Sequence, residues 1–238
     1  ILLKNSNIRK NVGNYFRLHP TLRLIVKFPY EINSHKYPLP LHAITEFLPD
    51  IRLSGTNFSL GILGSLISED WGKRNYLIKD WKKIIILYVM IRPKSYGKIY
   101  NIPIINHPFI YYNLVSEDFN MLSFGLTKYV KALFKNGAEE IIPCIDNINP
   151  LKYKDNLNCL NPNQLMNQNL NLMSIHLFGS CIPGKNLDFC STNSYGLIRD
   201  IDNCYVCDAS QLPEAIGVNP QATIMAMAYR NIENFLNK

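Results

Sequence analysis

The amino-acid sequence predicts an α+β protein, in which a mainly antiparallel sheet with flanking helices is followed by a C-terminal β-loop-α unit. Three observations predict this fold class. Residues 21–29, TLRLIVKFP, alternate apolar and polar side chains as a half-buried strand does. Residues 116–137 carry apolar side chains at helical spacing. Residues 204–236 fit a strand, a loop and a terminal helix.

The first half of the chain supplies most of the expected strands. In the first strand Leu22, Leu24, Val26 and Phe28 form the apolar face, and Ile25 belongs to the opposite face. Residues 30–60 are rich in Pro, Ser and Asn and predict a long excursion from the sheet. Residues 84–100, IIILYVMIRPKSYGKIY, predict a hairpin that turns between Pro93 and Gly97, and PIINHPFIYY (103–112) continues the sheet.

The clearest helix begins at Ser116, a good N-cap residue, and Glu117 and Asp118 complement the helix dipole in its first turn. Gly137 can end this helix. Residues 151–172 are rich in Asn and Leu and predict a loop.

At the C-terminus, CYVCDAS (204–210) predicts a buried strand that places Asp208 at its carboxyl end, where ligands bind in open α/β sheets. A terminal helix is expected from about Pro220 to Leu236, with Asn219 as its N-cap. The N-terminus of such a helix favours an anion, or a carbonyl that becomes anionic.

Composition limits the classes of protein that are possible. The chain has 238 residues, of which 47% are hydrophobic and 18% charged, as expected for a globular protein with a substantial core. No apolar run approaches the roughly 20 residues of a membrane helix, so no transmembrane segment is predicted. The start at Ile1 rather than Met suggests that the true start of translation is missing. The sequence does not fix the compartment and slightly favours a soluble, cytoplasmic protein.

The charge distribution does not indicate a nucleic-acid partner. Residues 1–100 contain 16 Lys and Arg against 6 Asp and Glu, within a net charge of +7 for the chain. These basic residues stand singly or in pairs, and no nucleic-acid-binding motif accompanies them. A solvated basic surface is the favoured interpretation.

The cysteines are best explained as free thiols. All six lie between residues 144 and 207, in a chain that is too large to need a disulfide framework. Cys204 and Cys207 form a Cys-x-x-Cys, which raises the alternative of a zinc or redox site. In a strand, however, residues three apart point to opposite faces, and no second Cys or His pair lies nearby in sequence. We therefore expect both cysteines to be packing residues, with no metal site.

His176, in SIHLFGSC (174–181), has four possible roles. It could be half of a metal site. It could be the base for a nucleophile at Ser180 or Cys181, but the hydrolase pattern Gly-x-Ser-x-Gly is not met in FGSCIPG. It could be a structural histidine whose polar atoms are satisfied. It could also be a base that serves a group outside this sequence.

Two stretches together resemble the C-terminal signature of the glucose–methanol–choline (GMC) flavin oxidoreductases. They are HLFGSC (176–181) and YVCDASQLPEAIGVNPQATIMAMAYRN (205–231). The resemblance extends to ILLKNSNI and VGNYFRLHP near the N-terminus and to VMIRPKSYGKIY in the middle of the chain. Members that act on long-chain or hydrophobic alcohols are the most similar. The sequence departs from the family pattern after Cys181, where Ile182-Pro183-Gly184 replaces the usual Arg-Met-Gly.

The resemblance implies roles for six residues. His176 would accept the alcohol proton, and Asn219 would hydrogen-bond the substrate oxygen. Asp208 would bind the ribityl chain of FAD, with the backbone of Ala209 close to the cofactor. The backbone of Pro220 and Gln221 would face the pyrimidine edge of the flavin.

The FAD-binding fingerprint Gly-x-Gly-x-x-Gly is not present, because no two of the 12 glycines are spaced by two. The resemblance therefore implies a connecting segment from the FAD-binding domain (1–19), a substrate-binding domain (20–172) and a C-terminal segment that completes a Rossmann-like FAD-binding domain (173–238). The expected activity is FAD-dependent oxidation of a small-molecule alcohol, with a separate N-terminal FAD-binding half as partner. The alternative is a non-catalytic binding domain, or an inactive truncated fragment, that kept the fold.

Overall fold

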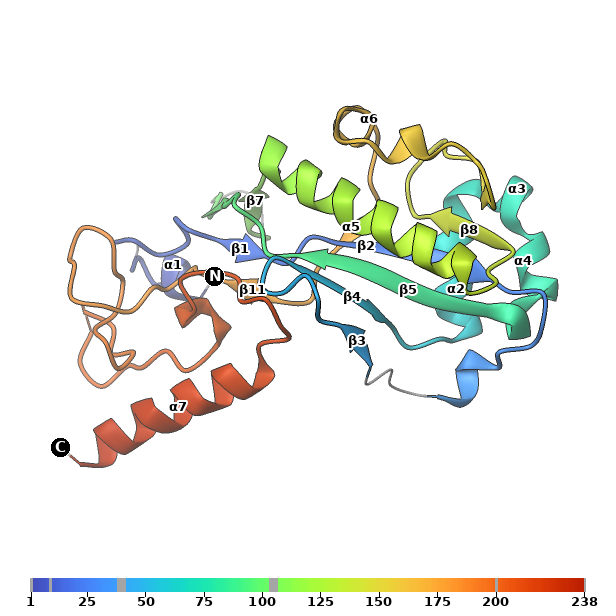
Figure 1. Ribbon diagram of the computed structural model, residues 1–238. Coiled ribbons are helices and arrows are strands. Elements are labelled where there is room, and N and C mark those ends of the chain that lie inside the picture. The colour runs from blue at the N-terminus through green and yellow to red at the C-terminus, as the bar shows by residue number, and fades with distance from the viewer. Residues whose placement is uncertain (1, 9, 38–41, 103–106, 200, 238) are drawn as a thin grey trace. The chain divides into compact units, whose positions relative to one another are not determined.

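The computed structural model describes residues 2–8, 10–37, 42–102, 107–199 and 201–237. The chain divides into two compact units. The sheet unit comprises residues 20–91 and 116–173, and the terminal unit comprises residues 1–19, 92–115 and 174–238. Antiparallel strand pairs together with helices confirm the predicted α+β fold class (Figure 1).

The sheet unit is built on a seven-stranded antiparallel sheet in the order β3-β4-β5-β2-β8-β9, with β10 also paired to β2. Its strands are β2 (Thr21–Lys27), β3 (Ala43–Ile44), β4 (Ile51–Gly55), β5 (Ile84–Ile91), β8 (Glu140–Pro143), β9 (Leu151–Lys152) and β10 (Leu172–Met173). Its α-helices are α2 (Leu60–Ile67), α3 (Trp71–Arg74), α4 (Tyr76–Lys79), α5 (Ser116–Lys135) and α6 (Pro162–Met166). Short 3₁₀ turns cover Ser34–Lys36, Ser68–Asp70, Trp81–Lys83 and Leu157–Leu160.

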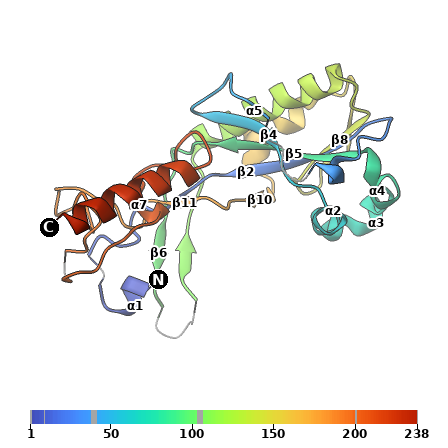
Figure 2. The same cartoon turned by 90° about the horizontal axis from the view of Figure 1, so that it is seen from below.

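Strand β2 is central because it pairs with β5 on one side and with β8 on the other. Both faces of the sheet are covered around it. Helix α5 lies along one face, and the short helices α2 to α4 lie on the other side (Figure 2). Ile25, which the alternation assigns to the polar face, is consequently completely buried, as are Leu24 and Val26. The prediction of a half-buried strand was therefore correct in position and wrong for Ile25.

Helix α5 confirms the clearest helix of the sequence. Leu122, Leu126 and Val130 are completely buried against the sheet, and Gly137 ends the helical run with a positive φ of 89°. The Ala138 N–H donates to the Leu133 carbonyl, which is the 6→1 bond of a Schellman ending.

The terminal unit contains α1 (Leu2–Asn5), the pair β1 (Arg17–Leu18) and β11 (Leu177–Phe178), the ribbon β6 (Lys98–Tyr100) and β7 (Phe109–Tyr111), a 3₁₀ turn (Ala209–Gln211) and α7 (Gln221–Leu236). The sequence placed residues 92–115 in the substrate-binding domain. In the structure this segment packs in the terminal unit, because Phe16 and Gly97 exchange both backbone hydrogen bonds and the Ile99 N–H donates to the Gly13 carbonyl.

The predicted hairpin of residues 84–100 was wrong. Strand β5 pairs with β2 and β4, whereas β6 pairs with β7. Pro93 has no N–H to donate to a neighbouring strand, which favours the chain leaving the sheet there. Residues 103–106 of the predicted continuation lie outside the described residues. The excursion of residues 30–60 also contains β4, and the loop of residues 151–172 contains α6 and two short strands.

CYVCDAS does not form the expected buried strand. Among the described residues it makes one isolated bridge, Leu197 with Tyr205, and Cys207 is exposed. Beside this bridge, the Ile198 N–H donates to the Cys204 carbonyl and the Val206 N–H donates to the Gly196 carbonyl. A strand is buried on both faces only when neighbouring elements cover both faces. Residues 196–198 alone do not provide that cover.

The approach of α5 to the sheet gives a stability prediction. A Cβ added at Gly125 would lie 2.7 Å from Val89 Cγ1 and 3.0 Å from Ile51 Cγ2. Overpacking costs about 1–3 kcal/mol and outweighs the roughly 1 kcal/mol that alanine gains in a helix. Gly125→Ala should therefore lower the free energy of unfolding, measured by chemical denaturation. At Gly64 of α2 an added Cβ meets no atom within 4 Å, so Gly64→Ala is the matched control and should not destabilise.

Candidate active site

The β1–β11 pair of the terminal unit brings two histidine side chains into contact. Leu18 lies opposite Leu177 in this antiparallel register, so the adjoining residues His19 and His176 also come opposite each other. Their Nδ1 atoms are 2.9 Å apart, and their rings meet edge to face with centroids 5.1 Å apart. His19 is completely buried and His176 is half-buried.

Further hydrogen bonds hold the His19 ring and the backbones of both histidines. The His19 Nε2 lies 2.5 Å from the carbonyl oxygen of Ile216. The His19 N–H donates to Ser174 Oγ at 3.1 Å, and the Ser174 hydroxyl donates to the His176 carbonyl at 3.0 Å. No role was predicted for His19 from the sequence; the signal for it is the His-Pro that ends VGNYFRLHP.

The surroundings of His19 keep its ring neutral. Burial, as the largest cause, and the neighbouring His176 lower the pKa of His19 to about 4. The hydrogen bond to Ile216 acts in the opposite direction but is outweighed.

One pocket contains five of the six residues that the resemblance singled out. His176, Ala209, Asn219, Pro220 and Gln221 line a surface pocket with a volume of about 460 Å³. Its remaining lining is apolar and comes from Ile175, Leu177, Ile224 and Met225. These side chains come from three separate stretches of sequence, which the terminal unit brings together.

Helix α7 begins at this pocket, but Asn219 does not cap it. The N-cap residue is Pro220, and no described side chain makes a capping hydrogen bond there. Because proline fixes φ near the helical value, Pro220 already adopts αR geometry with φ −85° and ψ −2°, and its carbonyl accepts the first helical bond, from the Ile224 N–H. The exposed Asn219 lies one residue before the cap. The predicted capping role was wrong by one position.

Asp208 faces a different pocket. Its Oδ1 accepts from the Ser210 N–H at 2.8 Å and from the Ser210 hydroxyl at 2.5 Å, which caps the 3₁₀ turn Ala209–Gln211. The carboxylate lines a pocket of about 280 Å³ together with Ser180 and Cys181, whereas the next residue, Ala209, lines the His176 pocket.

The cysteines do not support a nucleophile or a metal site. Burial is the main cause that raises the pKa of the Cys181 thiol, and a thiol nucleophile needs the opposite shift. Gly179 has φ +71°, and an added Cβ would collide with the Tyr15 carbonyl, so the tight turn after β11 requires glycine. Cys204 is half-buried and Cys207 exposed, which corrects the expectation that both are packing residues. The described residues contain no group of three or more His, Cys, Asp or Glu that could hold a metal.

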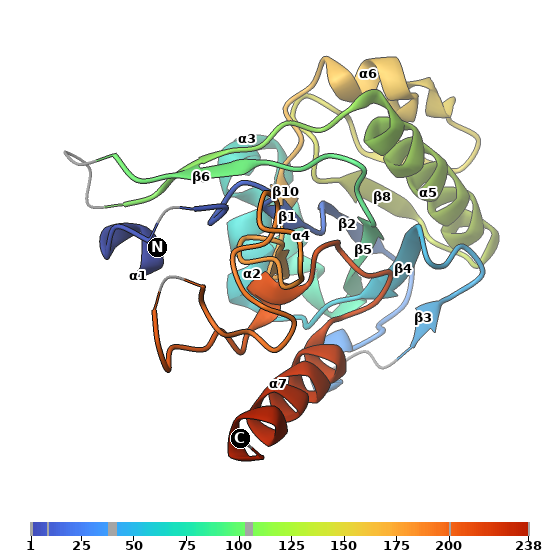
Figure 3. The ribbon, with the colours of Figure 1, turned by 90° about the vertical axis from the view of Figure 1, so that its left-hand side faces the viewer.

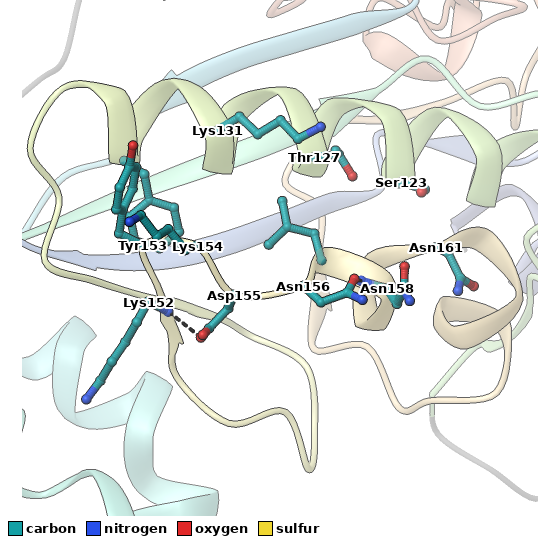
Figure 4. Close-up of a pocket in the computed structure, with 12 residues that line it drawn as sticks. Ser123, Thr127, Lys131, Lys152, Tyr153, Lys154, Asp155, Asn156, Asn158 and Asn161 are labelled. Carbon is teal, nitrogen blue, oxygen red and sulfur yellow. Dashed lines mark hydrogen bonds between the residues drawn. The ribbon is translucent and has the colours of Figure 1, made fainter.

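A larger pocket, of about 530 Å³, lies in the sheet unit (Figure 4). Lysine, asparagine and tyrosine side chains line it, and it contains none of the predicted site residues.

Among the described residues, no helix combines the length and the apolar character needed to cross a membrane.

Comparisons with known proteins identify the class of protein. A family model described as GMC oxidoreductase matches residues 107–228, just over half of the chain. The chain therefore belongs to the GMC oxidoreductase family.

Its relatives are longer proteins. It is 39% identical over 236 residues to an uncharacterised GMC-type oxidoreductase of Sinorhizobium fredii, covering 99% of this chain and 47% of that protein. It is 25% identical to the long-chain-alcohol oxidase FAO3 of Arabidopsis thaliana, covering 96% of this chain and 33% of that protein. The chain thus spans half or less of the length of these relatives.

A solved structure shares the fold. The pyridoxine 4-oxidase of Mesorbium loti superposes with a TM-score of 0.64 at 12% identity, over 96% of this chain and 44% of that chain. At this level of identity the likeness shows the fold alone.

The lowered pKa of His19 predicts that acid destabilises the protein. The unfolded histidine titrates near 6.5 and the folded one near 4, so the unfolded state binds more protons between these values. Stability should fall by up to about 3 kcal/mol as the pH drops from 6.5 to 4, and this contribution should change no further below 4. Thermal unfolding across this range measures the loss. The His19→Asn variant should show a shallower pH dependence, and an identical slope in both proteins would contradict the assignment.

Proposed function

We propose that the chain is the C-terminal, active-site-bearing part of an FAD-dependent oxidoreductase that oxidises the CH–OH group of an alcohol. The observation that carries the proposal is the single pocket that holds His176 and Asn219 at the start of α7. A proton acceptor, a hydrogen-bonding amide and a helix N-terminus are groups that suit oxidation of an alcohol by a flavin.

The residues of the pocket fit the flavin of FAD. Leu177, Ile224 and Met225 offer apolar walls to a flat ring, and the small Ala209 allows close approach of its backbone. The backbone of Pro220 and Gln221, at the positive end of a 16-residue helix, suits the polar pyrimidine edge of the ring. When bound, FAD supplies a hydride acceptor for the carbon that carries the hydroxyl. Asp208, on the neighbouring pocket, would bind the ribityl hydroxyls.

The chain's own side chains act on the alcohol hydroxyl. His176 accepts its proton on a ring nitrogen, and a neutral imidazole is a suitable base near neutral pH. The amide of Asn219 donates a hydrogen bond to the substrate oxygen and so orients the hydroxyl. The apolar walls of the pocket, and the similarity to a long-chain-alcohol oxidase, favour a hydrophobic alcohol as substrate.

Helix α7 also supports an N-terminal FAD-binding half as partner. One side of α7 packs Ile224 and Met227 against a buried cluster of the terminal unit, next to the loops that precede the helix (Figure 3). On another side, Met225, Tyr229, Ile232 and Leu236 recur at helical spacing and are each at least 50% exposed. Such an exposed apolar stripe is typical of a protein–protein contact. The chain contains no Gly-x-Gly-x-x-Gly for the pyrophosphate of FAD.

The missing pyrophosphate site predicts that the isolated chain binds FAD weakly. After incubation with FAD and desalting, its visible flavin absorbance should be close to zero. The corresponding FAD-binding part of the Sinorhizobium fredii relative should restore flavin retention on mixing. Ile232→Glu, on the apolar stripe, should weaken this association more than Glu233→Lys, which changes a charge at the adjacent exposed position. Stoichiometric flavin retained by the chain alone would contradict the proposal.

The roles of His176 and Asn219 predict losses of different size. In the FAD-containing enzyme, His176→Ala removes the proton acceptor and should slow flavin reduction by about 10²–10⁴-fold while flavin stays bound. Asn219→Ala removes one hydrogen bond and should slow it by about 10-fold. Because Asn219 does not cap α7, its loss should leave the melting temperature nearly unchanged.

Stopped-flow reduction by excess alcohol measures both rates. If His176 has only a structural role, His176→Ala will lower the melting temperature and leave the reduction rate near that of the parent. The same result would remove His176 from the proposed chemistry.

A further inference from the structure

The hydrogen bonds of the histidine pair determine where its protons lie. The Ile216 carbonyl can only accept, so the His19 Nε2 that approaches it to 2.5 Å carries a hydrogen. A neutral His19 then has its lone pair on Nδ1. The hydrogen in the 2.9 Å contact between the two Nδ1 atoms must therefore belong to His176. A neutral His176 consequently carries its lone pair on Nε2.

This assignment depends on a neutral His19, and the packing around the ring favours that state. His19 is completely buried, and the ring of the equally buried Phe178 lies 4.9 Å from it, centroid to centroid. Removing a cation from water into such surroundings is costly, which agrees with its lowered pKa. A doubly protonated His19 would instead donate to His176 Nδ1. The hydrogen of His176 would then lie on its Nε2, and that nitrogen could not accept a proton.

We propose that His19 is a positioning residue that holds His176 in the Nδ1–H tautomer, so that its Nε2 lone pair is the acceptor of the alcohol proton. The inference rests on the proposed function of His176 as base. In the step itself, the hydroxyl proton moves to Nε2 and His176 becomes an imidazolium. Its Nδ1–H continues to donate to His19, so no proton needs to leave or enter the His19 ring.

Ser174 contributes to this arrangement through the backbone. Its hydroxyl accepts from the His19 N–H and donates to the His176 carbonyl, which uses its single hydrogen without conflict. The β1–β11 register and the Ser174 bridge hold the backbones of the two histidines, and the Ile216 carbonyl orients the His19 ring. Both the distance and the direction of the Nδ1 contact are thus fixed from outside the two rings.

The first test is a spectroscopic measurement on the chain, independent of alcohol oxidation. Long-range ¹H–¹⁵N spectra of histidine-labelled protein at neutral pH report the tautomer of each of its five histidines. His19→Asn and His176→Asn assign the signals. We expect the Nε2–H form for His19 and the Nδ1–H form for His176. A His176 that is in the Nε2–H form, or that exchanges between both forms, would overturn the proposal, as would a cationic His19.

The second test uses the FAD-containing enzyme. His19→Ala should slow flavin reduction by about 10- to 100-fold, because the His176 ring is no longer held in one tautomer. His19→Asn provides an oxygen that can accept from the Nδ1–H and should recover a large part of this loss. His35→Ala, which removes a histidine packed on Trp81 in the sheet unit, is the control and should retain the parent rate.

A double-mutant cycle separates positioning from other effects. In the His176→Ala background, His19→Ala should change the rate by less than about twofold, because His19 acts only through His176. Equal losses in His19→Ala and His19→Asn, or a loss that persists in the His176→Ala background, would overturn the proposal. A His176→Ala enzyme with the parent rate would instead overturn the proposed role of His176 as base, and the spectra would still decide the tautomer.

Discussion

The short antiparallel pairing of β1 with β11 is the constraint on which the candidate site depends. It joins Arg17–Leu18 to Leu177–Phe178, across more than half of the chain. The Gly13 N–H donates to the Ser180 carbonyl and extends the contact between the two segments. Because the register is fixed, His19 must lie opposite His176; a slip by one residue would turn each side chain to the other face. At the tight turn that follows, Gly179 lies so close to the Tyr15 carbonyl that an added Cβ would collide with it.

A buried neutral histidine is an unusual orienting group for a base, and its neutrality has a consequence. A carboxylate beside His176 would stabilise the imidazolium through charge and raise the pKa of the base. His19 accepts the same hydrogen bond without adding a negative charge. In the proposed arrangement it therefore selects a tautomer of His176 and adds no negative charge beside the imidazole.

The elements that could be predicted from the sequence are those whose signal is local. The apolar spacing of α5 and α7, and the apolar runs of β2 and β5, can be recognised within a single window of residues. The errors concern pairing and cover, which depend on residues far away in the chain. The sequence around residues 98–100 shows a strand but not that its partner is residues 109–111. In the same way, Cys204–Ser210 has strand-like composition, but among the described residues it forms one isolated bridge, between Tyr205 and Leu197.

The candidate site shows the same division. His176, Asn219 and their neighbours came from a motif, and the structure places five of the six in one pocket. His19 could not be assigned a role from sequence, because its position depends on the register of a pair formed across the whole chain. The displacement of Asn219 from the helix cap was missed for a local reason. Asn and Pro are both good helix starters, and only the backbone geometry shows that Pro220 takes the cap.

The positions of the site residues along the chain explain how short segments can hold them accurately. His176 is two residues from Phe178, Ala209 is three from Leu212, and Pro220 is four from Ile224. Phe178 and Leu212 are buried in one apolar cluster, against which Ile224 packs. Each of these three site positions therefore lies within four residues of a side chain that belongs to, or packs on, the same cluster. The cluster fixes the relative positions of three segments that would otherwise be flexible loops, which gives the pocket its shape without a continuous sheet beneath it.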